Sequence, residues 1–319
     1  MTTTTSVGQA ASAATASGSR LQLARVWDQY GMLVIFAILI NMRGLGLAVS
    51  MSGMVACGML FCLASGEFDM SVGSVVACSG VACAVGINAT ESITVGILAG
   101  MLVGVLFGLI NGIVVAKFKI NALITTLATM QMARGVGYII SDGKAVGIVE
   151  ERFFELGNSA LLGIPTPVWL TAVCFVLFGL LLNKTTFGRN TLAMGGNEEA
   201  ARLAGVNVVR TKIIIFTMTG LIASIAGIIL ASRMTSGQPM TSIGFELVVI
   251  SACVLGGVSM KGGSGKISYI IAGVLILGLM ENAMNLLNIS PFAQYVVRGL
   301  ILLAAVLFDR YKQVRKARI

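Results

Sequence analysis

The sequence predicts an all-α protein, a polytopic helical membrane protein with about ten transmembrane helices and both termini in the cytoplasm. Of its 319 residues, 56% are hydrophobic and only 11% are charged. Soluble chains carry about 25% charged residues, because a water-facing surface needs them. A chain this poor in charge must have lipid as part of its solvent. It also contains no histidine, the commonest general base, which argues against the chain being an enzyme by itself.

Apolar stretches of roughly the length that crosses a bilayer, about 20 residues, follow one another along the chain. Several are shorter than this, and the first is weak, so whether it crosses the membrane stays open. Residues 1–28 are expected to form a disordered cytoplasmic tail, residues 29–308 the transmembrane domain and residues 309–319 a basic cytoplasmic tail. The expected spans are 29–41, 44–64, 70–88, 93–115, 121–141, 166–183, 211–232, 246–259, 267–287 and 291–308.

The basic residues give the expected orientation. The net charge is +9, but with alternating loops most of the 22 Lys and Arg residues fall on one side. Basic loops stay in the cytoplasm, so the excess charge sets topology rather than indicating a nucleic-acid partner. The other side holds Arg43, Lys144, Arg152 and Arg233. The cytoplasmic side holds Arg20, Arg25, Lys117, Lys119, Lys184, Arg189, Arg202, Arg210, Lys212, Lys261, Lys266, Arg310, Lys312, Arg315, Lys316 and Arg318.

No cofactor or metal site is expected on this chain. The segment that ends at Gly265-Lys266 is rich in glycine, but Met260 and Ile267 occupy positions where a phosphate-binding P-loop needs Gly and Ser or Thr. The six cysteines all lie inside apolar runs and are expected to be small buried hydrophobic residues. They are Cys57, Cys62, Cys78, Cys83, Cys174 and Cys253.

The span at 93–115 has a glycine at every fourth position. Residues four apart share one face of a helix, so these glycines form a smooth groove into which another backbone can pack. A tight helix crossing is the expectation, and a pore-facing or moving surface is the alternative. The glycines are Gly96, Gly100, Gly104, Gly108 and Gly112.

Several polar groups lie in or beside the spans. Glu67 and Asp69 fall in an irregular segment, 65–73, and are not expected to face lipid, because irregular backbone at membrane depth must be buried in protein or line a cavity. Asn111, Asn282 and Asn285 could contact a transported molecule or hydrogen-bond between helices. For the remaining ionisable groups a structural pair and a role in a pathway both stay open: Arg134, Glu246, Glu281 and Arg298.

The expected extracytoplasmic loop, 142–165, is acidic and is the only sizeable one on its side. Its acidic residues, among them Glu150 and Glu151, outnumber its basic ones. The loop has room for a short helix but not for a domain. We expect it to contact a partner outside the membrane.

The expected cytoplasmic loop, 184–210, contains a short helix with clear end signals. Asn197 can cap it, acidic residues in the first turn favour the positive end of the helix dipole, and Gly205 provides a stop. A helix this short is marginal alone, and it makes sense as a rigid element inserted into a groove on a partner. The alternative is a surface helix that only turns the chain. Its residues are Glu198, Glu199, Ala200, Ala201, Arg202, Leu203 and Ala204.

This loop resembles the coupling motif Glu-Ala-Ala-x-x-x-Gly of ABC importer permeases, here Glu199-Ala200-Ala201 followed by Gly205. The longer form Gly-Gly-Asn-Glu-x-Ala-x-Arg-Leu-x-Gly, residues 195–205, is similar to the ribose/arabinose/xylose sugar permease family. The resemblance extends over nearly the whole chain. It includes the segments 65–73, 163–169, 244–247 and 254–265.

The resemblance implies a bacterial inner-membrane permease for a pentose sugar, L-arabinose before ribose, xylose or galactose. It also implies a homodimer, a periplasmic sugar-binding protein and a cytoplasmic ATPase with two nucleotide-binding halves, which would hold ATP and Mg²⁺. Residues 198–205 would dock on that ATPase. About a dozen residues of the family pattern are absent after Ile40, which affects only the first span. An ion-coupled secondary carrier or a passive channel is the competing class, and its transport would need no ATPase.

Overall fold

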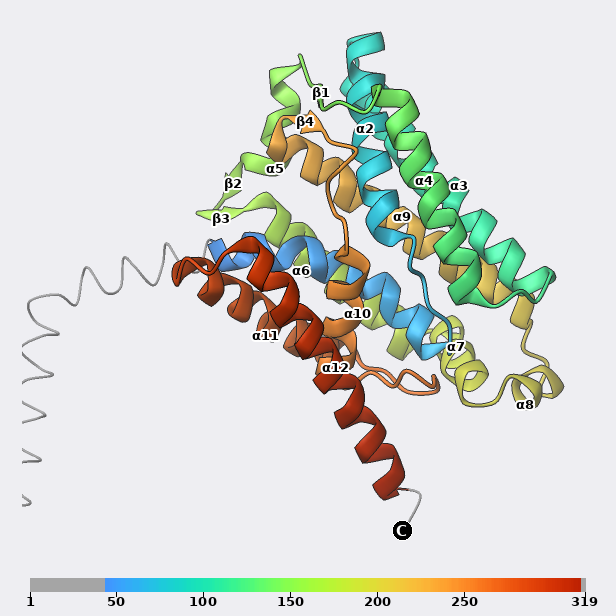
Figure 1. The fold of residues 1–319 in the computed structure, drawn as a ribbon. Coiled ribbons are helices and arrows are strands. Elements are labelled where there is room, and N and C mark those ends of the chain that lie inside the picture. Colours follow the sequence, from blue (N-terminus) through green and yellow to red (C-terminus); the bar gives the residue numbers. More distant parts are fainter. Residues whose placement is uncertain (1–43, 317–319) are drawn as a thin grey trace, which may run out of the picture. The chain divides into compact units, whose positions relative to one another are not determined.

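The computed structural model describes residues 44–316, which lie, apart from Gly44, within one compact unit, Leu45–Ile319. The expected span 29–41 and the tail 1–28 fall outside the described residues. Most of the described chain is helical (Figure 1). The longer helices are Gly44–Ala64, α2 Val72–Thr90, α3 Ile93–Lys117, α4 Ala122–Ser141, α6 Thr166–Lys184, α9 Val208–Met234, α10 Phe245–Gly256, α11 Ile267–Leu286 and α12 Pro291–Lys316.

The connections contain short elements. These are β1 Val146–Gly147, η1 Glu151–Phe154, α5 Glu155–Asn158, β2 Ala160–Leu161, β3 Ile164–Pro165, α7 Thr186–Gly196, α8 Glu198–Leu203 and β4 Ser236–Gly237. Strand β1 pairs antiparallel with β4, and β2 pairs antiparallel with β3. The expected external loop 142–165, for which the sequence predicted room for a short helix, therefore holds η1, α5 and three short strands, one of which pairs with β4 outside the loop.

The bundle has two distinguishable ends (Figure 1). We call the one that carries the four short strands and α5 the β end. The other, which carries α7, α8 and the loops 65–71 and 257–266, is the α8 end. Asn88 Nδ2 of α2 donates to Gly147 O at 2.7 Å, and Ser232 Oγ of α9 donates to Phe153 O at 2.7 Å. These bonds attach the 142–165 segment to two long helices.

Six of the described helices are long and apolar enough to cross a membrane, namely Gly44–Ala64, α2, α3, α6, α9 and α11. The apolar part of α12, Pro291–Leu307, and all of α10 are shorter. The 12 residues of α10 give a length of about 18 Å against a hydrocarbon core of about 30 Å, so α10 cannot cross alone. The sequence predicted a span at 246–259; the structure has a half-length helix there instead.

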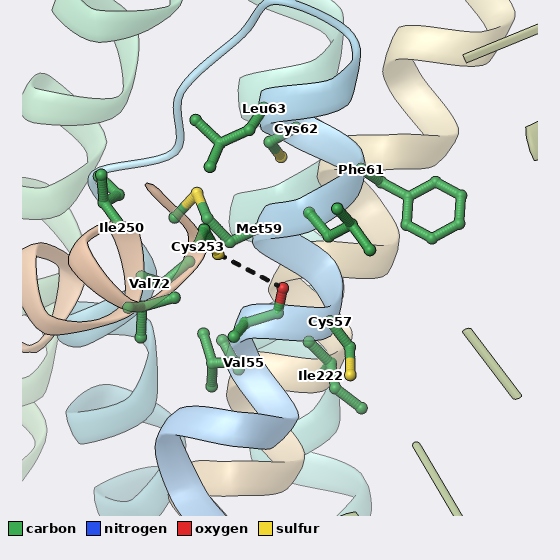
Figure 2. Close-up of a cluster of buried hydrophobic side chains, with 14 of the residues drawn as sticks. Val55, Cys57, Met59, Phe61, Cys62, Leu63, Val72, Ile222, Ile250 and Cys253 are labelled. Atoms are coloured by element: carbon green, nitrogen blue, oxygen red, sulfur yellow. Dashed lines mark hydrogen bonds between the residues drawn. The ribbon is translucent and has the colours of Figure 1, made fainter. Parts of the chain in front are cut away.

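The helix Gly44–Ala64 lies in the middle of the hydrophobic core. Figure 2 shows Val55, Met59 and Phe61 of this helix among side chains of α2, α9 and α10. Phe61 also stacks on Phe187 of α7, with ring centroids 5.7 Å apart. A helix that is apolar on all sides is one that other helices surround, which explains why this span is the most buried of the six.

The glycine face of α3 packs against α2 and α9. All five of its glycines are buried. A Cβ at Gly108 would lie 2.5 Å from Phe216 O, and one at Gly100 would lie 2.8 Å from Ser79 O. Gly104 of α3 and Gly220 of α9 face one another so closely that each excludes a side chain from the other. Of the two alternatives, the structure places this face in a helix crossing.

The chain between β4 and α10 is not helical and runs into the bundle (Figure 1). Arg134 of α4 holds it there: its Nη1 donates to Pro239 O at 2.6 Å and to Thr241 O at 2.7 Å. Gly244 then starts α10 with φ +76°. Backbone carbonyls away from water need partners, and a guanidinium supplies them here.

The first prediction concerns the α3–α9 crossing. Gly108→Ala should lower the stability of the protein by about 1–3 kcal/mol, because the new Cβ overlaps a backbone oxygen that cannot move independently. Gly135→Ala on α4 is the matched control, since a Cβ there meets nothing within 4 Å. The melting temperature in detergent measures both. Equal melting temperatures for the two variants would contradict the tight crossing.

Candidate functional site

The helix α8 begins and ends at the residues that the sequence indicated. Asn197 Oδ1 accepts from Ala200 N at 2.9 Å, which caps the helix. At the other end Gly205 has φ +87°, and Val206 N donates back to Ala201 O at 3.0 Å. A left-handed glycine followed by such a bond is a common helix stop. The short helix is therefore locally specified at both ends.

One face of α8 is exposed and the other is held by the rest of the chain. Leu203 is 90% exposed, and Glu199, Ala200, Arg202 and Ala204 are exposed beside it. Ala201, in contrast, is only 5% exposed and belongs to the hydrophobic core. The sequence interpretation grouped Ala201 with the residues offered to a partner, and the structure corrects that, because sequence spacing alone did not tell which side of α8 faces inward.

Lys212 of α9 connects α8 to the loop 65–71. Its Nζ donates to Glu198 Oε2 at 2.8 Å and to Glu67 Oε1 at 2.6 Å. The Lys212 side chain is only 10% exposed. Its hydrogen bond, together with its positive charge, lowers the pKa of Glu198 against the opposing effect of burial. Glu198 also pairs with Arg202 at 3.1 Å, one turn along the helix. Two acidic residues that are 131 positions apart thus share one cation.

The glycine-rich loop 257–266 packs closely at the α8 end. Gly263 N donates to Ala64 O at 2.9 Å, at the end of the central helix. Gly262 and Gly263 have φ +82° and +73°, and a Cβ at Gly262 would lie 2.7 Å from Gly195 O of α7. The loop that failed as a nucleotide-binding motif is a close backbone junction between α7 and the central helix.

A buried polar chain continues from the loop 65–71 into the bundle. Asp69 Oδ1 accepts from Ser71 N at 2.9 Å and from Ser71 Oγ at 2.6 Å. Asn111 Nδ2 of α3 donates to Ser71 Oγ at 3.0 Å, and Thr129 Oγ1 of α4 donates to Asn111 Oδ1 at 2.7 Å. Burial raises the pKa of Asp69 to about 6, although both Ser71 hydrogen bonds oppose the shift. The chain joins α2, α3 and α4 to the loop.

The predicted polar residues thus fall into two places. Glu67 and Asp69 lie at the α8 end, and Asn282 and Asn285 lie near the β end of α11. Asn282 is half-buried, but Asn285 is exposed and accepts from Gln294 Nε2 at 2.9 Å. Asn285 is therefore not the buried polar residue that the sequence suggested. Hydropathy gives the depth of a residue along a helix, but not the direction of its side chain.

Sequence reasoning missed Lys212 as a site residue. It was counted among the basic residues that set topology, and its two partners are 145 and 14 positions away. The sequence did contain a signal for it. Lys212 lies in the first turns of the long apolar helix α9, and two glutamates begin α8, a short distance before it in the sequence. Within the described residues, no cluster of three or more Cys, Asp or Glu side chains could hold a metal ion.

Comparison with known proteins identifies the class. A family model described as "Branched-chain amino acid transport system / permease component" matches residues 23–306. The chain therefore belongs to this family of membrane permeases, and the resemblance drawn from the sequence is confirmed. No solved structure matches the chain.

Individual relatives show which permeases of this family the chain is similar to. The L-arabinose transport system permease protein AraH of Escherichia coli (strain K12) is 72% identical over 312 residues, which cover 93% of this chain and 95% of the relative. The L-arabinose ABC transporter permease protein AraH of Azospirillum brasilense is 51% identical over 86% of this chain and 80% of its own. The ribose import permease protein RbsC of Bacillus subtilis (strain 168) is 42% identical over 86% and 85%.

The second prediction concerns Lys212. Lys212→Met should destabilise the protein by about 1–3 kcal/mol, because Glu67 loses its cation and Glu198 keeps only the exposed Arg202. Lys212→Arg keeps the charge and should retain most of the stability. Melting temperatures of Lys212→Met, Glu67→Gln and the double variant give the coupling between the side chains. Additive effects would show that the loop 65–71 is not held through Lys212.

Proposed function

We propose that this chain is the membrane-spanning permease subunit of an ATP-binding cassette importer that carries L-arabinose across the bacterial inner membrane. The order of similarity supports this most directly, since two L-arabinose permeases are 72% and 51% identical while the ribose permease of Bacillus subtilis is 42% identical. A permease for ribose, xylose or galactose is the alternative within the same class.

We propose further that α8 is the helix through which an ATPase drives the permease. Its exposed face presents Leu203 with small residues beside it, which suits insertion into a groove. The ATPase, with its two nucleotide-binding halves, would hold the ATP and Mg²⁺, and this chain would bind neither. The α8 end would then face the cytoplasm, with both termini on that side, in agreement with the basic residues there.

The contacts of α8 suggest how its movement reaches the membrane. A force on α8 acts through Glu198 and Lys212 on Glu67, and hence on the loop 65–71. Through Asp69 and Ser71, the same loop is bonded to α3 and α4. ATP binding would move α8 and with it these helices, opening the permease outward to accept sugar, and hydrolysis would reset it.

The β end is the surface that we propose for the periplasmic sugar-binding protein. Leu162 is 85% exposed and Val149 is 81% exposed there, beside the exposed Glu151. The hydrogen bonds from Asn88 and Ser232 hold this segment against α2 and α9. Contact with a partner would therefore act on α2, which begins directly after the loop 65–71, and on α9, which carries Lys212. A second copy of the chain would complete the translocation path.

The third prediction tests the function itself. In proteoliposomes with the cognate ATPase and binding protein, the chain should take up labelled L-arabinose only when ATP is present. An excess of unlabelled L-arabinose should inhibit this uptake more strongly than equal concentrations of ribose, xylose or galactose. Uptake that persists without the ATPase, or that collapses when ion gradients are dissipated, would favour a carrier instead.

The fourth prediction tests the docking face of α8. Leu203→Glu should weaken association with the ATPase at least about tenfold, because an exposed apolar anchor is replaced by a charge. Leu162→Glu at the β end is the control, since Leu162 is 85% exposed but lies away from α8. Co-purification measures association, and the melting temperature of both variants should stay near that of the native chain. Undiminished co-purification of Leu203→Glu would exclude this face of α8.

A further inference from the structure

A polar cavity of about 310 Å³ lies beside the broken segment that precedes α10. Its walls come from the central helix Gly44–Ala64, from the non-helical residues 240–243, and from α10, α11 and α12. The volume is at the lower end of the range of small-molecule sites, about 300–1,000 Å³. The polar residues that line it are Ser52, Ser242, Glu281, Tyr295 and Arg298.

The polar lining of the cavity lies some way along the bundle from the β end, whereas Met240, Ile243 and Tyr295 in its walls are more than half exposed. Ser52 is eight residues into the helix that starts at Gly44, Glu281 is five residues before the end of α11, and Arg298 is seven residues after the start of α12. At 1.5 Å per residue, these positions are about 7–12 Å from the β end. Polar residues at this depth are costly and normally mark a pathway or a structural pair.

The ionisable groups of the cavity form a neutral pair with unused hydrogen-bonding capacity. Arg298 Nε lies 3.0 Å from Glu281 Oε1, and the guanidinium lies 5.7 Å from the ring centre of Tyr295. The Arg298 side chain is 35% exposed and that of Glu281 is 22% exposed, so both reach the open space. A guanidinium has five N–H donors and a carboxylate accepts at two oxygens, and one contact between them leaves most of these sites available.

Beyond the Glu281–Arg298 pair, the side chains that line the space change from polar to mostly apolar. A smaller cavity of about 100 Å³ shares Val248, Glu281, Tyr295 and Arg298 with the polar one, and its other walls are mostly apolar. Leu277 and Leu302, which line it, lie one helical turn beyond Glu281 and Arg298 in the direction of the α8 end. The polar space therefore ends at the Glu281–Arg298 pair, with apolar side chains behind it.

We propose that this cavity is a sugar-contact site of the permease itself, in which the Glu281–Arg298 pair binds the hydroxyl groups of a pentose that enters from the β end. A neutral polyol donates hydrogen bonds to a carboxylate and accepts them from a guanidinium, and the pair adds no net charge that would attract ions. Ser52 and Ser242 offer further hydroxyl contacts, and the Tyr295 ring offers an apolar face. The inference rests on the proposed transport of a pentose and goes beyond it by locating the contact.

The fifth prediction tests this site by thiol labelling. Ser52→Cys, in the complete importer without binding protein, should react with a membrane-impermeant methanethiosulfonate, and L-arabinose at high concentration should slow the reaction at least threefold. Ser159→Cys, exposed at the β end, is the control that L-arabinose should not protect. The native chain gives the background, since five of its six cysteines are buried. Betaine, a small solute without hydroxyl groups, should protect neither position.

The pair itself is tested by adding Glu281→Gln or Arg298→Lys to the Ser52→Cys chain. Each should abolish the protection by L-arabinose while the labelling rate without sugar stays within twofold. Protection that survives both changes, or equal rates with and without sugar in Ser52→Cys alone, would overturn the site. Uptake by the native importer separates the two proposals. ATP-driven arabinose uptake without protection refutes the site alone, and absent arabinose uptake refutes the function.

Discussion

The absence of water inside a bilayer is the constraint on which the structure depends, because every polar group there must find its partner within the protein. The described residues show this at three places. Near the α8 end, Lys212 donates to two glutamates. In the half of the bundle nearer the β end, Arg134 donates to two backbone carbonyls, and Glu281 forms an ion pair with Arg298. Each place joins different segments of the chain, so the few polar side chains help to fix how the apolar helices are arranged.

The same constraint explains how the chain between β4 and α10 can be non-helical inside the bundle. An unwound segment inside the bundle would leave carbonyls without donors, and Arg134 removes that cost at Pro239 and Thr241. The segment is then free to place Ser242 in a cavity wall and to start α10 well inside the bundle. The half-length α10 and the polar cavity both adjoin this unwound segment, whose carbonyls accept from the Arg134 side chain in place of helical backbone donors.

Much of the fold could be predicted because its causes are local. Apolar runs give helices, Asn197 and Gly205 give the ends of α8, and the fourfold glycine spacing on α3 gives a face for close packing. The remainder depends on which side chains meet across the fold. The sequence around 246–259 is apolar whether or not its helix crosses the membrane, Ala200 and Ala201 differ only in direction, and Lys212 reaches Glu67 across 145 positions. Neither the composition nor the spacing of the residues indicates which of these side chains meet.

The packing of the helices connects the cavity to the α8 end. Helices α2, α3 and α9 pack on one another, and α10 packs on both α11 and α12. The glycine crossing makes the first group rigid, since its backbones touch without intervening side chains. The central helix is buried among members of both groups, and it shares the cavity with the second. Because the Lys212 connection and the Asp69 chain act on the first group, a shift of that group that carried the central helix with it would alter the spacing between Ser52 and the Glu281–Arg298 pair. A site placed there would loosen its sugar as α8 moves, although no residue of α8 touches it.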